Sequence, residues 1–204
     1  MLPIFLIFAV SAIALSPCAI MLVRRAKALN KIKALASRCG FKIKNAHRFV
    51  FLARNRGATY DVVLANKQRV YAVKLWSALH NDSTLVVCPD NTYYVARGVS
   101  EPFEQKDREE YNLRNRRRKV PDTKLTVKVG AGREMVNVLL ICPPYKKIMQ
   151  RRGKDILIYE QGDRIFGKTV YFPDGFEKLI LESADPRRAE MIKLGVCESP
   201  KSKR

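Results

Sequence analysis

The chain has 204 residues, of which 47% are hydrophobic, and it carries a formal net charge of +20 at pH 7. This is enough apolar chain for one domain with a core, and the charge predicts anionic partners. Five cysteines form no CxxC pair, and only two histidines accompany them. This pattern argues against a zinc site and a disulfide framework, and it is typical of reduced thiols in a reducing compartment.

The N-terminal segment, residues 1–23, contains no charged side chain and is followed by Arg24-Arg25-Ala26-Lys27. As a helix it rises about 35 Å, enough to cross the ~30 Å hydrocarbon core of a bilayer. The sequence therefore predicts a transmembrane helix over residues 1–23. Because the basic residues follow the apolar run, we expect a single-pass membrane protein with its N-terminus outside and its domain in the cytoplasm. A cleaved secretory or lipoprotein signal and a buried helix of a soluble domain are the alternatives.

A second helix, over residues 24–40, is predicted to continue from the span as a basic juxtamembrane helix. Leu29, Ile32, Leu35 and Cys39 recur at helical spacing, and Gly40 follows as a stop signal. Lysines and arginines occupy many of the other positions. We expect this basic face to lie near anionic lipid headgroups.

The rest of the core, residues 41–182, predicts one α/β or α+β domain with a mixed sheet and flanking helices. Its composition predicts extended segments, in chain order, at 41–53, 61–64, 69–76, 84–88, 92–99, 136–142, 156–159 and 168–172. The segment 136–142 is apolar throughout, which is typical of a strand buried on both faces. Asp174 is expected to cap a final helix over 175–182.

Two further segments differ from this core in composition. Residues 101–122 are rich in charge and are expected to form a basic surface insert, either a loop or a solvated helix. Its basic block consists of Arg114, Arg116, Arg117, Arg118 and Lys119. Residues 183–204 turn polar and end in lysine and arginine, which predicts a basic C-terminal tail.

One pair of charged residues stands out within the predicted strands. Asp61 opens one strand, and Lys74 lies near the end of the next. Alternation along a strand places Lys74 on the same face as Ala72 and Trp76. A lysine in so apolar a run needs a partner, and Asp61 at the start of the neighbouring strand is the natural candidate.

This succession of elements resembles the core of restriction-endonuclease-like proteins, in particular the nuclease-related NERD-type and Mrr-like branches of the PD-(D/E)xK superfamily. The matching features are a helix, Asp61 at the start of a hairpin, a strand ending in Val73-Lys74, a later buried strand and a final helix. The resemblance covers roughly residues 26–182. It implies that Asp61, with an acid two residues before Lys74, binds Mg²⁺, and that Lys74 helps to activate the attacking water.

The second acid of that motif is missing, because its position is occupied by Ala72. Mg²⁺ needs near-octahedral oxygen ligands, usually including one or two carboxylates. Asp82, Glu134 and Asp163 are the candidate replacements. Without a replacement, Asp61 and Lys74 form a neutral pair with a structural or ligand-contacting role, and no cofactor is expected. The remaining alternative is another α/β fold in which Lys74 extends its charged end to solvent.

Two functions follow from these observations. The first is a membrane-anchored, nuclease-like but catalytically degenerate domain that binds anionic lipid, nucleic acid or an acidic protein. Its expected contact residues are Arg24, Arg25, Lys27, Lys31, Arg114, Arg116, Arg117, Arg118 and Lys119. The alternative is a membrane-tethered, Mg²⁺-dependent nuclease that uses Asp61, Lys74 and a carboxylate from elsewhere in the chain.

Overall fold

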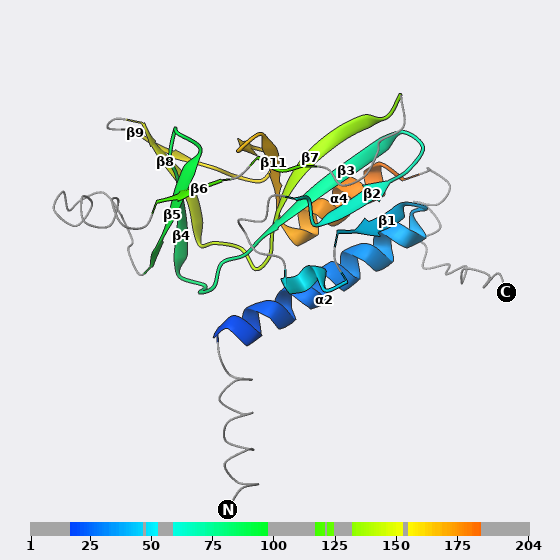
Figure 1. The fold of residues 1–204 in the computed structure, drawn as a ribbon, viewed down its shortest axis with the longest axis horizontal. Helices are drawn as coiled ribbons and strands as arrows, with labels where there is room; N and C mark the ends of the chain where they lie inside the picture. The colour runs from blue at the N-terminus through cyan, green and yellow to red at the C-terminus, as the bar shows by residue number, and fades with distance from the viewer. Residues whose placement is uncertain are drawn as a thin grey trace, which may run out of the picture.

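The computed structural model describes residues 17–46, 48–52, 59–97, 117–120, 122–124, 132–152 and 155–184. Within these residues the chain is a mixed α/β protein with two sheets and two α-helices (Figure 1). The sequence predicted one mixed sheet. Two form because the hairpin at 83–97 joins the later strands at 147–158 instead of extending the first sheet.

The first sheet contains six strands in the order β1-β2-β3-β7-β11-β10. β1, β2 and β3 are an antiparallel meander, whereas β7 and β11 are added in parallel to β3. The strands are Lys42–Asn45, Val62–Ala65, Arg69–Trp76, Glu134–Ile141, Lys168–Tyr171 and, at the edge, Arg164–Ile165.

The second sheet contains five strands in the order β6-β5-β4-β8-β9. In sequence order they are β4 Ser83–Val87, β5 Thr92–Arg97, β6 Arg118–Lys119, β8 Lys147–Arg152 and β9 Asp155–Ile158. In the first sheet β3 and β7 are parallel neighbours, and in the second sheet β4 and β8 are parallel neighbours. The chain passes from β3 into β4, and from β7 into β8, so both connections lead from the first sheet to the second. The sequence did not predict β8, whose apolar and basic residues show no clear alternation.

Two helices cover one face of the first sheet (Figure 1). α2, Pro17–Arg38, buries Leu29, Ile32 and Ala36 in the core that it shares with α4, Pro173–Glu182. The short 3₁₀ helix η1, Val50–Leu52, lies beside α2. The opposite face of the first sheet packs against the second sheet through a separate core that contains Trp76, Leu139 and Tyr93.

The C-terminal end of α2 shows why Gly40 is a stop signal. Gly40 has a φ of 83°, in the left-handed region that favours glycine. Its N–H donates to the carbonyl of Ser37, and the N–H of Phe41 donates to the carbonyl of Ala36. This is the Schellman arrangement, and Phe41 and Ala36 both join the helix-side core. At the other predicted cap, Asp174 lies inside the first turn of α4, and Phe172 is the N-cap residue.

The prediction of a transmembrane helix over residues 1–23 is corrected by the structure. No helix in the described part of the chain is both long and apolar enough to cross a bilayer. Residues 17–23, which the sequence assigned to the span, are the first turns of α2 and continue into the basic segment without a break. Residues 1–16 lie outside the described residues, as does the predicted tail beyond residue 184.

Candidate functional site

Asp61, directly before β2, is in contact with Lys74 near the end of the neighbouring strand β3. The Nζ atom of Lys74 is 3.0 Å from Oδ2 and 3.1 Å from Oδ1 of Asp61. It also donates to the carbonyl of Thr59 at 3.1 Å. The carboxylate also accepts a hydrogen bond from the backbone N–H of Leu75 at 2.8 Å. Two successive residues of β3, Lys74 and Leu75, therefore bind it. Both side chains are buried, that of Lys74 being 2% and that of Asp61 3% exposed.

Arg25 adds a third buried charge from α2. The sequence assigned it to a lipid or nucleic-acid contact, but its side chain is 2% exposed. Its Nε donates to the hydroxyl of Ser77 at 2.7 Å, and that hydroxyl hydrogen-bonds to the carbonyl of Cys142. Tyr145 donates its O–H to the carbonyl of Ser77 at 3.0 Å. Arg25 therefore ties the helix to the ends of β3 and β7, where the chain leaves the first sheet.

Burial disfavours the charged form of all three side chains. It raises the pKa of Asp61, while the nearby Lys74 and Arg25 and the N–H of Leu75 act in the opposite direction. It lowers the pKa of Lys74, which the attraction of Asp61 partly offsets. It lowers the pKa of Arg25 as well. One buried carboxylate thus interacts electrostatically with two buried cations, and its removal takes this favourable interaction from both of them.

Lys168 on β11 is a further buried cation that sequence reasoning missed. Its ammonium donates to the carbonyl of Phe166 at 3.2 Å and lies 5.9 Å from the ring centre of Tyr60. Burial, and then the charge of Lys74, lower its pKa. The available sequence signal was a lysine at the start of the short, largely apolar strand Lys168–Tyr171.

Among the residues that the structure describes, none of the three candidate carboxylates pairs with Asp61 or joins it in a metal-binding group. Ala72 is fully buried at its position in β3. Asp82 pairs with Arg97 at 3.4 Å, and Glu134 pairs with Arg69 at 2.8 Å. The carboxylate of Asp163 accepts the N–H of Glu160. Among the described residues, no group of three or more metal-ligating side chains could hold an ion.

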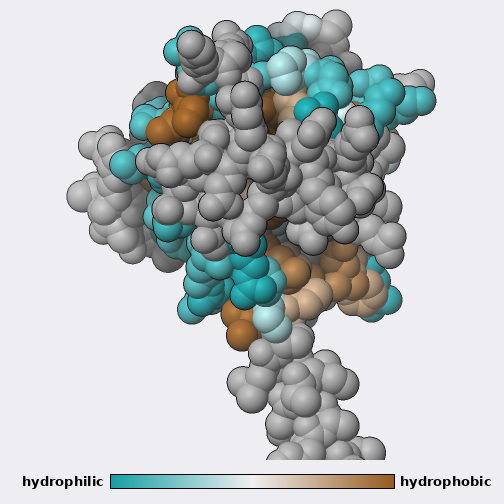
Figure 2. Space-filling view, turned by 90° about the vertical axis from the view of Figure 1, so that its left-hand side faces the viewer, coloured by the Kyte–Doolittle hydropathy of each residue, from teal (hydrophilic) through white to brown (hydrophobic). Residues whose placement is uncertain are grey.

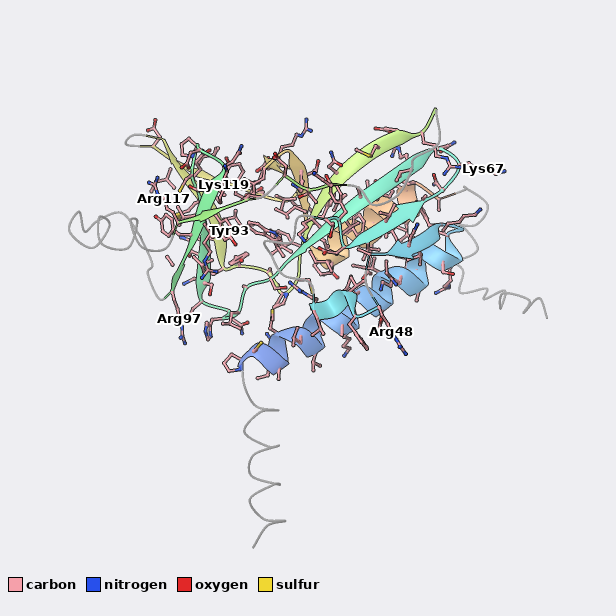
Figure 3. The ribbon with its side chains drawn as sticks, in the orientation of Figure 1. Arg48, Lys67, Tyr93, Arg97, Arg117 and Lys119 are labelled. Carbon is pink, nitrogen blue, oxygen red and sulfur yellow. The ribbon has the colours of Figure 1, made fainter. Side chains whose placement is uncertain are left out.

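The predicted contact residues fall into two groups far apart in the fold. Arg24, Lys27 and Lys31 lie on α2, and Lys31 forms an ion pair with Glu177 of α4 at 2.9 Å. Arg117, Arg118 and Lys119 belong to the second sheet, where Arg118 and Lys119 form β6 (Figure 3). Arg117 lies 3.9 Å from Asp90. Arg114 and Arg116 are outside the described residues.

The cations of α2 share their side of the molecule with exposed apolar side chains, a signal that the sequence analysis did not use. In Figure 2, brown hydrophobic and teal hydrophilic residues adjoin at the lower end of the face, where α2 lies in Figure 1. We call this the basal surface. It consists of Ile20, Val23, Phe49, Leu52 and Leu79 with the cations Arg24, Lys27 and Arg48.

Three contacts connect the parts of the basal surface. η1, which follows Arg48 and Phe49, packs beside α2, and Arg48 lies on the α2 side of the molecule in Figure 3. The guanidinium of Arg48 is 5.6 Å from the ring centre of Phe49. Arg24 donates to the side-chain oxygen of Asn81 at 3.0 Å, in the turn that carries Leu79.

Comparisons with protein-family models, with curated proteins and with solved structures give no match to this chain. Two features of the molecule bear on its function: the buried charges around Asp61 and the basal surface.

Proposed function

We propose that this protein binds anionic lipid surfaces peripherally, through the basal surface, and that its Asp61–Lys74 pair has a structural role. The observation that carries the proposal is the joint exposure of apolar and cationic side chains on one face of α2. Of the nine large hydrophobic side chains exposed in the described residues, five belong to the basal surface. Such a concentration of apolar surface next to charge marks an interaction site.

The face that α2 exposes is suited to lying in a headgroup layer. Ile20, Val23 and Lys27 follow the i, i+3, i+7 spacing of one helix face, and Arg24 is adjacent to them on the next turn. Val23 is 67% exposed, the highest value among the large hydrophobic residues. An interfacial helix combines such apolar residues, which enter the acyl boundary, with cations that face the headgroups.

Charge balance favours this surface over the second sheet. Asp61 is the first acidic residue of the chain, so α2, β1 and η1 contain none. In the second sheet, Arg97 and Arg117 are each within 4 Å of an aspartate. Each Lys or Arg held near an anionic leaflet contributes about 1 kcal/mol. Arg24, Lys27 and Arg48 together therefore supply ~3 kcal/mol, or roughly a hundredfold in affinity.

The test is binding of the full-length protein to vesicles of phosphatidylcholine with and without phosphatidylserine, at low and high salt. Replacing Arg24, Lys27 and Arg48 by Gln should weaken binding to phosphatidylserine vesicles roughly a hundredfold and reduce its dependence on salt. Val23→Glu should weaken binding to both vesicle types, because it removes apolar contact and adds a repelled charge.

The matched control replaces Arg118, Lys119 and Lys147 by Gln. These exposed cations of the second sheet give the same change in net charge. The control should bind vesicles nearly as the unmodified protein does. Equal losses from both triple variants would overturn the proposal, because they would show a net-charge effect. Preferential, salt-dependent binding of duplex DNA over vesicles would overturn it in favour of a nucleic-acid partner.

The structural role of the Asp61–Lys74 pair rests on its surroundings. A carboxylate that already binds an ammonium and a backbone N–H, and that belongs to no metal-ligating group in the described part of the chain, is a poor ligand for Mg²⁺. The resemblance to restriction-endonuclease-like proteins would then be a likeness of core architecture without the catalytic metal.

A further inference from the structure

The edge strand β9 exposes a second concentration of apolar side chains, far from the basal surface. Ile156, Leu157 and Ile158 are 47%, 41% and 53% exposed. Consecutive residues of a strand point to opposite faces, so β9 exposes apolar side chains on both faces of the second sheet. It ends the second sheet in the described residues, with β8 as its one neighbour. An exposed apolar edge of this kind is a template for pairing with another strand.

The backbone of β9 has hydrogen-bonding groups available for such a partner. The N–H of Tyr159 donates to the carbonyl of Ile148 at 2.8 Å, so this pair is hydrogen-bonded across the β8–β9 ladder. The pair Leu157–Gln150 lies two residues further along the same ladder. Hydrogen bonds alternate along an antiparallel pair, so Leu157 bonds toward β8. Ile156 and Ile158 therefore direct their N–H and C=O groups outward, away from the sheet.

We propose that β9 pairs with β9 of a second copy of this chain, antiparallel about a two-fold axis at Leu157. In this register Ile156 of one copy is opposite Ile158 of the other, and four outward backbone hydrogen bonds form. The isoleucines of both copies meet on one face, and the two Leu157 side chains meet on the other. The two second sheets become one continuous sheet. Two-fold contacts of this self-complementary kind are the commonest in homo-oligomers.

The charges that flank β9 favour the same arrangement. Before the apolar residues the sequence has three bases and one acid, and after them two acids and one base, so the net charge is positive before them and negative after them. These residues are Arg151, Arg152, Lys154 and Asp155, and Glu160, Asp163 and Arg164. Antiparallel pairing brings the basic end of one copy to the acidic end of the other. A parallel arrangement would align like charges, which is unfavourable. A second copy thus complements this edge in backbone pattern, apolar pairing and charge.

The oligomeric state of the full-length protein, measured by sedimentation velocity over a wide concentration range, tests the proposal. The unmodified protein should dimerise reversibly. Replacing Ile156 and Ile158 by Lys should weaken the dimer at least about tenfold, because lysines on an edge strand block pairing. Met135→Lys is the matched control: Met135 is 46% exposed in β7 of the first sheet, and its replacement should leave the dimer intact.

A cysteine placed at the two-fold axis tests the register. Directly opposed residues that do not exchange hydrogen bonds have Cα atoms about 4.5 Å apart, within the range of a disulfide. Leu157→Cys should therefore give a disulfide-linked dimer on mild oxidation, whereas Met135→Cys should not. A monomer at every concentration would overturn the proposal. So would a dimer that survives the two lysine substitutions, or the absence of the Leu157→Cys crosslink in a dimeric protein.

Discussion

Removing the charge of Asp61 should destabilise the protein more than removing that of its partner. In Asp61→Asn the amide oxygen can still accept the N–H of Leu75, but the buried ammonium of Lys74 loses its carboxylate and Arg25 loses a favourable electrostatic interaction. Breaking a buried pair in this way costs about 3–5 kcal/mol. For a domain of this size the melting temperature should fall by roughly 6–20 °C.

Lys74→Met is the informative comparison. It leaves Asp61 with the N–H of Leu75 and the charge of Arg25, so its cost should lie below that of Asp61→Asn. In the double variant no ammonium is left unpaired, and its cost should be clearly less than the sum of the single costs. Thermal and urea unfolding of the four proteins, followed by circular dichroism, supply this double-mutant cycle. Additive costs, or a smaller cost for Asp61→Asn than for Lys74→Met, would refute the proposed structural role.

Two further changes test the charges and the backbone of the core. Burial lowers the pKa of Lys168, so the unfolded chain keeps this proton to higher pH and stability should rise between the lowered pKa and the ordinary value of 10.5. Urea unfolding of Lys168→Met at several pH values should show a smaller rise in stability with pH. Lys178→Met, at an exposed position, should leave the rise unchanged. The same rise with pH in both variants would contradict a lowered pKa of Lys168. Gly40→Ala should cost about 1–2 kcal/mol, because its φ of 83° is unfavourable for a side chain. Unchanged thermal stability of Gly40→Ala would show that the helix end rearranges.

Several elements could be predicted from the sequence because their own side chains specify them. β3 was predicted at the residues where it occurs, because its β-branched and aromatic side chains are unbroken between polar turns. Gly40 marked the end of α2, and the apolar run at 136–142 marked the central strand β7. The pairing of Lys74 with Asp61 could also be predicted, because a lysine in an apolar run needs a partner and Asp61 opens the neighbouring strand.

Other features were decided by contacts between distant segments. The apolar residues 17–23 read as part of a membrane span because hydrophobicity alone does not separate a bilayer from a protein core. In the structure they begin a helix whose later residues pack on the first sheet. The burial of Arg25 could not be foreseen, since its partner Ser77 is 52 residues away in the sequence and meets it only when α2 crosses the end of β3.

The sequence by itself determined the large positive charge, the positions of most strands and the pairing of Asp61 with Lys74, all of which depend on composition and short spacings. Tertiary structure decided which cations are available to a partner. It buried Arg25, Lys74 and Lys168, and it placed Arg24 and Lys27 beside exposed apolar side chains. It also split the strands into two sheets and left β9 at an edge. Burial and strand order depend on which distant segments pack together, and no local pattern encodes that choice.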